Sequence, residues 1–192
     1  MICADNRYKT TKFTLSNRAL FSTGTVDHDM QAGIEIIHKD RLDATSAPGG
    51  TDKRYAAFVV DEMSIGQFTP ALRYERSTIE SAVPLAGVAN SYETDATMGG
   101  LAVAYDFNNG VSVFGSAAYT EGLPIIDDLG VTATAQRRLA MTERARSLEL
   151  GATYTDNDVF ASGDTFTMRG NLYQTKLWDI TSYTVAGAMG SD

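Results

Sequence analysis

Carboxylates are the side chains whose spacing comes nearest to a catalytic or metal-binding pattern in this chain. Asp127 and Asp128 are adjacent, and Glu121 precedes them in the same predicted loop. Paired carboxylates can act as general acid and base, and clustered ones can hold calcium. No flanking pattern fixes two of these three at a defined separation. We therefore interpret them as solvated loop charges.

Other groups that carry chemistry are few. Cys3 is the only cysteine, which excludes an internal disulfide and a cysteine-rich zinc site. The sequence has no nucleophile elbow with Ser, His and Asp, no phosphate-binding loop and no His-Glu-x-x-His helix. Of the two histidines, we interpret His28, which follows a short turn, as structural. We predict no catalytic residue, no resident cofactor and no metal site.

Composition narrows the class of protein. The chain has 192 residues and a formal charge of -8, which argues against a nucleic-acid partner, because phosphate binding needs clustered Lys and Arg. Its longest apolar stretches fall far short of the roughly 18 residues that a membrane helix needs. The first residues lack a basic segment followed by an apolar core, so they do not form a secretory signal.

Apolar residues recur at every other position, which is typical of strands with one oily face and one small or polar face. In one segment Met30, Ala32, Ile34 and Ile36 alternate with polar or small residues. The same pattern runs through 68–75, 100–105 and 147–154. We predict eight strands with these approximate bounds: 8–22, 27–40, 54–64, 67–76, 96–106, 111–120, 145–155 and 165–179.

The connections alternate between short and long. Tight turns are expected at 22–25, 64–66 and 106–110, where Asn109-Gly110 tolerates the positive φ of a hairpin. Long connections are expected at about 41–53, 77–95 and 121–143. An antiparallel up-and-down meander has two unlike ends of this kind. Tyrosines fall near the strand ends, where their rings suit a membrane interface: Tyr55, Tyr74, Tyr105, Tyr119 and Tyr154.

Two segments carry a family resemblance. AYTEGLPIIDDL at 118–129 and MTERARSLELG at 141–151 resemble a strand end and the next strand start in TonB-dependent outer-membrane receptors. The order of further segments supports it: PGGTD at 48–52, RYAAFVVDEM at 54–63, FTPALRYE at 68–75, NGVSVF at 109–114 and DVFASGDTFTMRGNLYQT at 158–175. The resemblance implies an all-β fold, part of a transmembrane β-barrel, in the outer membrane of a Gram-negative bacterium.

The resemblance also implies a function. Such receptors import an iron chelate or haem through the outer membrane, and the expected partners are outer-membrane lipid, that ligand, and the TonB protein through regions missing from this chain. The sequence resembles the haem-receptor subgroup most, although TAQRRLA at 134–140 replaces the Asn-Pro-Asn-Leu-like segment that those receptors often carry in this loop. The loop at 121–143 contains no His, Tyr or Cys for haem iron, and Met141 is a poor substitute. We predict these ligand-binding residues: His38, Tyr92, Glu121 and Arg137.

Polar residues in the strands have a place in this fold. Glu35, Arg73, Glu75, Glu149 and Arg169 are predicted to face a wet lumen, because an Arg near the middle of the lipid face costs about 2–4 kcal/mol. The family's barrel has about 22 strands and a plugged lumen.

We therefore expect residues 1–192 to be one partial barrel domain without a plug, seen as an open curved sheet or an incomplete barrel. Two alternatives remain at this point. One is a self-contained eight-strand outer-membrane barrel with a structural or adhesion role, in which the first and last strands pair. The other is a soluble all-β binding module, in which Ile34, Leu72 and Leu101 are buried against a second sheet.

Overall fold

The computed structural model describes residues 7–42, 49–65, 68–82, 86–87, 89–129 and 138–180. Two short 3-10 helices lie in the connection between the sixth and seventh strands, η1 (Ile126–Asp128) and η2 (Arg138–Ala140). The eight strands are β1 (Tyr8–Thr23), β2 (Val26–Arg41), β3 (Gly50–Met63), β4 (Thr69–Ser81), β5 (Ser91–Asp106), β6 (Val111–Gly122), β7 (Glu143–Asn157) and β8 (Thr165–Trp178).

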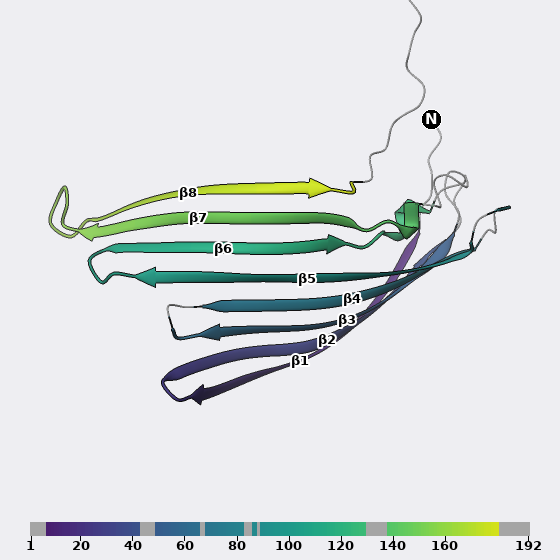
Figure 1. Ribbon diagram of the computed structural model, residues 1–192, viewed down its shortest axis with the longest axis horizontal. Helices are drawn as coiled ribbons and strands as arrows, with labels where there is room; N and C mark the ends of the chain where they lie inside the picture. Colours follow the sequence, from purple (N-terminus) through teal and green to yellow (C-terminus); the bar gives the residue numbers. More distant parts are fainter. Residues whose placement is uncertain are drawn as a thin grey trace, which may run out of the picture.

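All eight strands form one antiparallel sheet in chain order, so each strand pairs with its sequence neighbours (Figure 1). This confirms the predicted all-β meander. The sheet is open: β1 and β8 are its two edges and do not pair with each other. The self-contained barrel required that pairing. Among the described residues, no helix has the length and apolar character needed to span a bilayer.

The short turns all lie at one end of the sheet and the long connections at the other, as predicted. We call these the turn end and the loop end. Between β5 and β6 the positive φ values are at Asn108 (58°) and Gly110 (84°). The turn therefore occupies 107–110, with Asn108 rather than Asn109 in the left-handed region. Asp106 accepts a hydrogen bond from the Asn108 amide at 2.7 Å, which supports that conformation.

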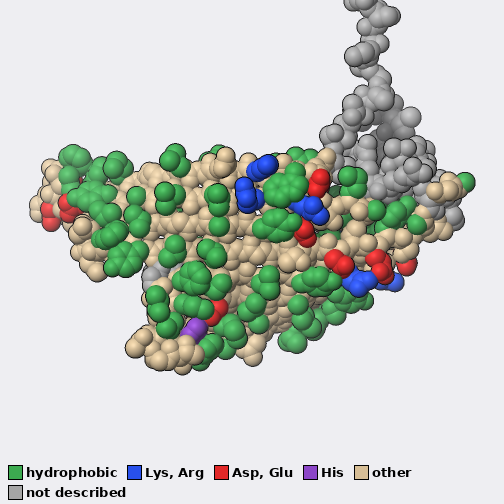
Figure 2. All heavy atoms as spheres, viewed as in Figure 1, with side chains coloured by type: hydrophobic (Ala, Val, Ile, Leu, Met, Phe, Trp, Pro, Cys, Tyr) green, Lys and Arg blue, Asp and Glu red, His purple; other side chains and the backbone are tan. Residues whose placement is uncertain are grey.

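The two faces of the sheet differ in chemistry. Because paired residues of neighbouring strands point to the same side, the register places Leu15, Ile34, Leu72 and Leu101 on one face, with all five tyrosines named above. We call this the apolar face. Figure 2 shows a face covered by hydrophobic side chains, with charged side chains gathering toward the loop end. Ile34, Leu72, Leu101 and Leu148 are 45%, 54%, 49% and 45% exposed. The second sheet that a soluble module would pack there is not present among the described strands.

The opposite face, which we call the polar face, carries Glu35, Arg73, Glu75, Glu149 and Arg169 in the register positions predicted for a lumen. Its small buried core lies at the loop end. There Ile79 packs with Ile126, Leu129 and Leu139 from the β6–β7 connection, and Tyr92 packs against this cluster. The connection is therefore folded onto the polar face.

The sheet is longer at the loop end than the sequence pattern predicted. β3 begins at Gly50, β4 continues to Ser81 and β5 begins at Ser91, each several residues beyond the expected bound. These extensions are rich in Thr, Ser, Asp and Glu and lack apolar alternation. Backbone pairing between the three strands and cover from the β6–β7 connection hold them in the sheet.

Candidate functional site

A continuous row of ion pairs crosses the polar face from β1 to β4. Glu35 of β2 is its first acidic group, and it contacts the Lys12 ammonium of β1 at 2.7 Å and the Arg73 guanidinium of β4 at 2.7 Å. Arg73 also contacts Glu75 at 3.2 Å. Because each carboxylate is shared between cations from different strands, the row joins strands that are not all sheet neighbours.

The row continues toward the loop end through Arg54 of β3. Its guanidinium donates to Asp52 at 2.8 Å and to Glu75 at 3.4 Å. Asp52 is fully buried, and its second oxygen accepts a hydrogen bond from the Ser77 hydroxyl at 2.9 Å. Lys39 lies 3.9 Å from Asp52. We call the whole set the polar ladder: Lys12, Glu35, Lys39, Asp52, Arg54, Arg73, Glu75 and Ser77.

Arg54 of β3 and Arg41 of β2 join the polar face to the β6–β7 connection. Arg54 donates to the carbonyl oxygen of Pro124 at 2.6 Å, and Arg41 donates to the carbonyl oxygen of Leu129 at 3.1 Å. Main-chain carbonyls in a loop need such donors when they are removed from water. The described part of the connection is thus anchored by two guanidinium groups as well as by the apolar cluster around Leu139.

Tyr92 lies on the polar face, packed against the apolar cluster around Ile79 and Leu139. It faces the same side as Ile79 and Asp52, with which it shares a register row. Its hydroxyl is buried and has no hydrogen-bond partner among the described residues. A buried phenol without a partner costs free energy, so it is a candidate for contact with a group that the structure does not contain.

Two of the other predicted ligand-binding residues, His38 and Glu121, lie on the face opposite to Tyr92. His38 and Glu121 lie on the apolar face near the loop end, by the same register rule. His38 contacts Asp40 at 3.1 Å, whereas Glu121 accepts hydrogen bonds from the Tyr119 hydroxyl at 2.6 Å and from the Thr97 amide at 2.8 Å. Arg137 lies outside the described residues. Ligand contact by any of the four remains a prediction.

Sequence reasoning missed the middle of the ladder. The sequence pattern predicts that this strand begins at Arg54, whereas β3 begins at Gly50 and so includes Asp52. The signal that was available is the alternation of charged residues at 52, 54, 73 and 75, which places them on one face once the extended strands pair.

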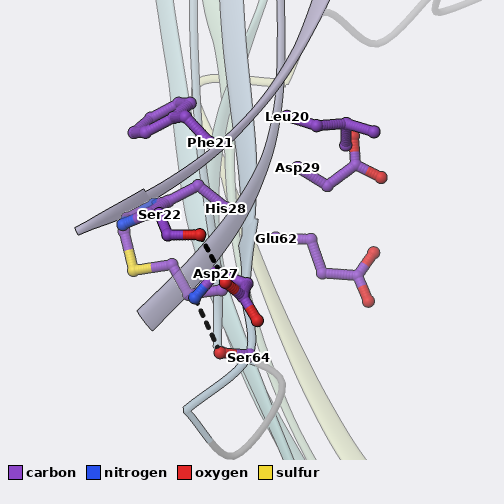
Figure 3. Close-up of a pocket in the computed structure, with 9 residues that line it drawn as sticks. Leu20, Phe21, Ser22, Asp27, His28, Asp29, Glu62 and Ser64 are labelled. Atoms are coloured by element: carbon purple, nitrogen blue, oxygen red, sulfur yellow. Dashed lines mark hydrogen bonds between the residues drawn. The ribbon is translucent and has the colours of Figure 1, made fainter. Parts of the chain in front are cut away.

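A pocket lies at the turn end, between the β1–β2 turn and β3 (Figure 3). Figure 3 shows Leu20, Asp29 and Glu62 on one side of the strands and Phe21 and His28 on the other. His28 Nδ1 lies 2.7 Å from Asp61, and the Phe21 ring stacks on the imidazole at a centroid distance of 4.6 Å. These contacts are those of a structural histidine. No group of three or more metal-ligating side chains is found in the described parts of the chain.

A family model described as "TonB dependent receptor-like, beta-barrel" matches residues 4–191. No curated protein matches the sequence. Among solved structures, the fold is similar to a double mutant of the Serratia marcescens hemophore receptor HasR, in complex with its hemophore HasA and heme, with a TM-score of 0.68 and 17% sequence identity. The match covers 90% of this chain and 33% of that one, so this chain spans about a third of the receptor's length.

Proposed function

Because the chain belongs to the TonB-dependent receptor β-barrel family, we propose that it forms part of the wall of an outer-membrane receptor that imports haem or another iron chelate. The observation that carries the proposal is the division of one open sheet into an exposed apolar face and a face crossed by the polar ladder. A barrel wall needs that division, since one side meets lipid and the other a wet interior. Members of this family act as transport receptors, not as enzymes.

The remainder of the receptor lies outside these 192 residues in this proposal. Eight strands with two unpaired edges would take their neighbours from further strands of the same barrel, because an unpaired edge presents free backbone donors and acceptors. The plug domain and the segment that contacts TonB would also come from outside this chain. The polar ladder would then face the plug across the lumen.

On the ligand side, we infer that the substrate passes the loop end of the polar face, beside Tyr92. The Tyr92 hydroxyl, which has no hydrogen-bond partner among the described residues, supports this, and a tyrosine oxygen is a known type of haem-iron ligand. An iron chelate could instead accept a hydrogen bond from the same phenol. His38 and Glu121 could contact the ligand only from the apolar face, at the loop end of the sheet.

The test uses the whole receptor that carries this chain, expressed in an outer membrane under iron limitation. Growth on haem, or on one ferric chelate, as the sole iron source should require the receptor. In the purified receptor, Tyr92→Phe should weaken binding of that iron source, whereas Tyr74→Phe, on the apolar face, should leave it unchanged. A receptor whose deletion changes growth on none of these iron sources would refute the proposed function.

A further inference from the structure

Two cations face each other on the apolar face without acidic partners. Arg146 of β7 and Lys176 of β8 are direct partners in the antiparallel register, and both are exposed. Like charges in directly opposite positions destabilise a strand pair, since their Cβ atoms are only about 4.5–5.5 Å apart. In the part of the chain that the structure describes, neither side chain has an ion pair or a side-chain hydrogen bond.

The neighbouring cation shows the contrast. Arg144 lies one row further toward the loop end and is paired with Glu121 at 3.5 Å and with Asp179 at 3.3 Å. The acidic residues of this region are therefore used by Arg144. Among the described residues, the positive charge of Arg146 and Lys176 is therefore left without an acidic partner. In Figure 2, Lys and Arg side chains gather on this face over β7 and β8.

The height of the pair on the sheet indicates what it meets. On β6, the other strand that pairs with β7, Tyr119 is the register partner of Arg146 and points to the same face. Tyr154 lies on β7, eight residues from Arg146 toward the turn end. Eight residues at about 3.4 Å, tilted by about 40°, span roughly 21 Å, close to the apolar band of a membrane barrel. The row of Tyr119, Arg146 and Lys176 thus lies at the interface of the leaflet on the loop side, where aromatic rings and headgroups meet.

We propose that Arg146 and Lys176 bind the phosphate of a lipid headgroup in the leaflet at the loop end. This inference depends on the proposed membrane location. A phosphate between the two cations would convert their repulsion into two charge-assisted contacts, and the ring of Tyr119 would lie against the first sugar or the acyl chain. The leaflet of the outer membrane that faces outward holds phosphorylated glycolipid, which has this chemistry.

The experiment compares binding of diphosphorylated lipid A and of its dephosphorylated form to the whole receptor in detergent micelles, by native mass spectrometry. Each cation near a charged lipid surface contributes about 1 kcal/mol, so each substitution should weaken binding about five-fold. The double variant Arg146→Gln/Lys176→Gln should bind diphosphorylated lipid A about 25-fold more weakly and the dephosphorylated form without change. Inorganic phosphate at millimolar concentration should not displace the lipid; displacement would mean that a free phosphate is the ligand and would overturn the lipid assignment.

Two further variants sharpen the test. Arg76→Gln removes a cation from the same face and the same end, but one already paired with Glu93 at 2.5 Å, so lipid binding should persist. Lys176→Glu creates an ion pair with Arg146 and should abolish the phosphate preference while raising the stability of the sheet.

If Arg146→Gln/Lys176→Gln and the wild-type receptor bind diphosphorylated lipid A equally, the proposal is wrong. The proposed function is checked separately, by insertion of the receptor into membranes. A receptor that inserts but shows no phosphate preference refutes only the lipid site, whereas one that does not insert refutes the membrane location itself.

Discussion

Replacing Arg54 with Met should cost more stability than any other single change in the polar ladder. The side chain is only 12% exposed, and it supplies contacts to Asp52, to Glu75 and to the Pro124 carbonyl oxygen. Met keeps most of the volume but removes every donor. Asp52, which is 0% exposed, would keep only the Ser77 hydroxyl and the distant Lys39 ammonium.

The magnitude follows from that geometry. Breaking a buried ion pair by removing one partner costs about 3–5 kcal/mol, because the other charge is left without compensation. We expect Arg54→Met to lower the free energy of unfolding by about that amount, measured by urea titration of the receptor in lipid vesicles. Asp52→Asn in the same background should recover part of the loss, since it removes the uncompensated charge while keeping the shape.

A double-mutant cycle over Arg54 and Asp52 measures how strongly the two side chains are coupled. A coupling free energy below about 0.5 kcal/mol would contradict the argument that the pair acts as a unit. Arg54→Lys serves as the matched control, because it keeps the charge but cannot reach Asp52, Glu75 and Pro124 together. Its loss should be intermediate between those of the wild type and Arg54→Met.

Two further predictions concern the sheet. Gly151→Ala should lower the free energy of unfolding by about 1–3 kcal/mol, because the added methyl group meets the Phe114 ring and lies 2.9 Å from the Gly170 carbonyl oxygen. In the control Gly170→Ala the added methyl group meets nothing within 4 Å, so stability should hardly change. Equal unfolding midpoints for the two variants would contradict this prediction. Val103→Arg places a cation on the apolar face, halfway between the levels of Tyr119 and Tyr154, and should make the free energy of folding into vesicles about 2–4 kcal/mol less favourable. Ser116→Arg, on the polar face, should fold nearly as well as the wild type. Equal folding yields for these two variants would mean that lipid does not contact the apolar face.

The alternation of residue types was enough to predict the strands and both faces. Ile34, Leu72 and Leu101 define the apolar face by their spacing alone, and Glu35 and Arg73 define the other. The pattern is strong in this region because one side of each strand is apolar and the other is not. The strand ends near Gly50, Ser81 and Ser91 were missed, since the apolar alternation does not continue into them.

The site was less predictable, because it depends on contacts between distant segments. Nothing local to Pro124 or Leu129 indicates that their carbonyls accept hydrogen bonds from arginines of β3 and β2. His38 and Glu121 were selected for residue type and position along the chain. A shift of one residue in a strand moves a side chain to the opposite face, so position near the rim could not say which side either would occupy.

The anchoring of the β6–β7 connection has a mechanical consequence. Arg54 donates to Asp52 and Glu75 on the strands and to the Pro124 carbonyl oxygen of the connection, so a force on either carboxylate reaches the connection through one guanidinium. One side chain, Arg54, therefore couples the strands of the sheet to the position of the β6–β7 connection. In the proposed receptor, a plug that pulls on the polar ladder would therefore weaken the hold on the β6–β7 connection, and a ligand bound at the connection would strengthen the link between the strands.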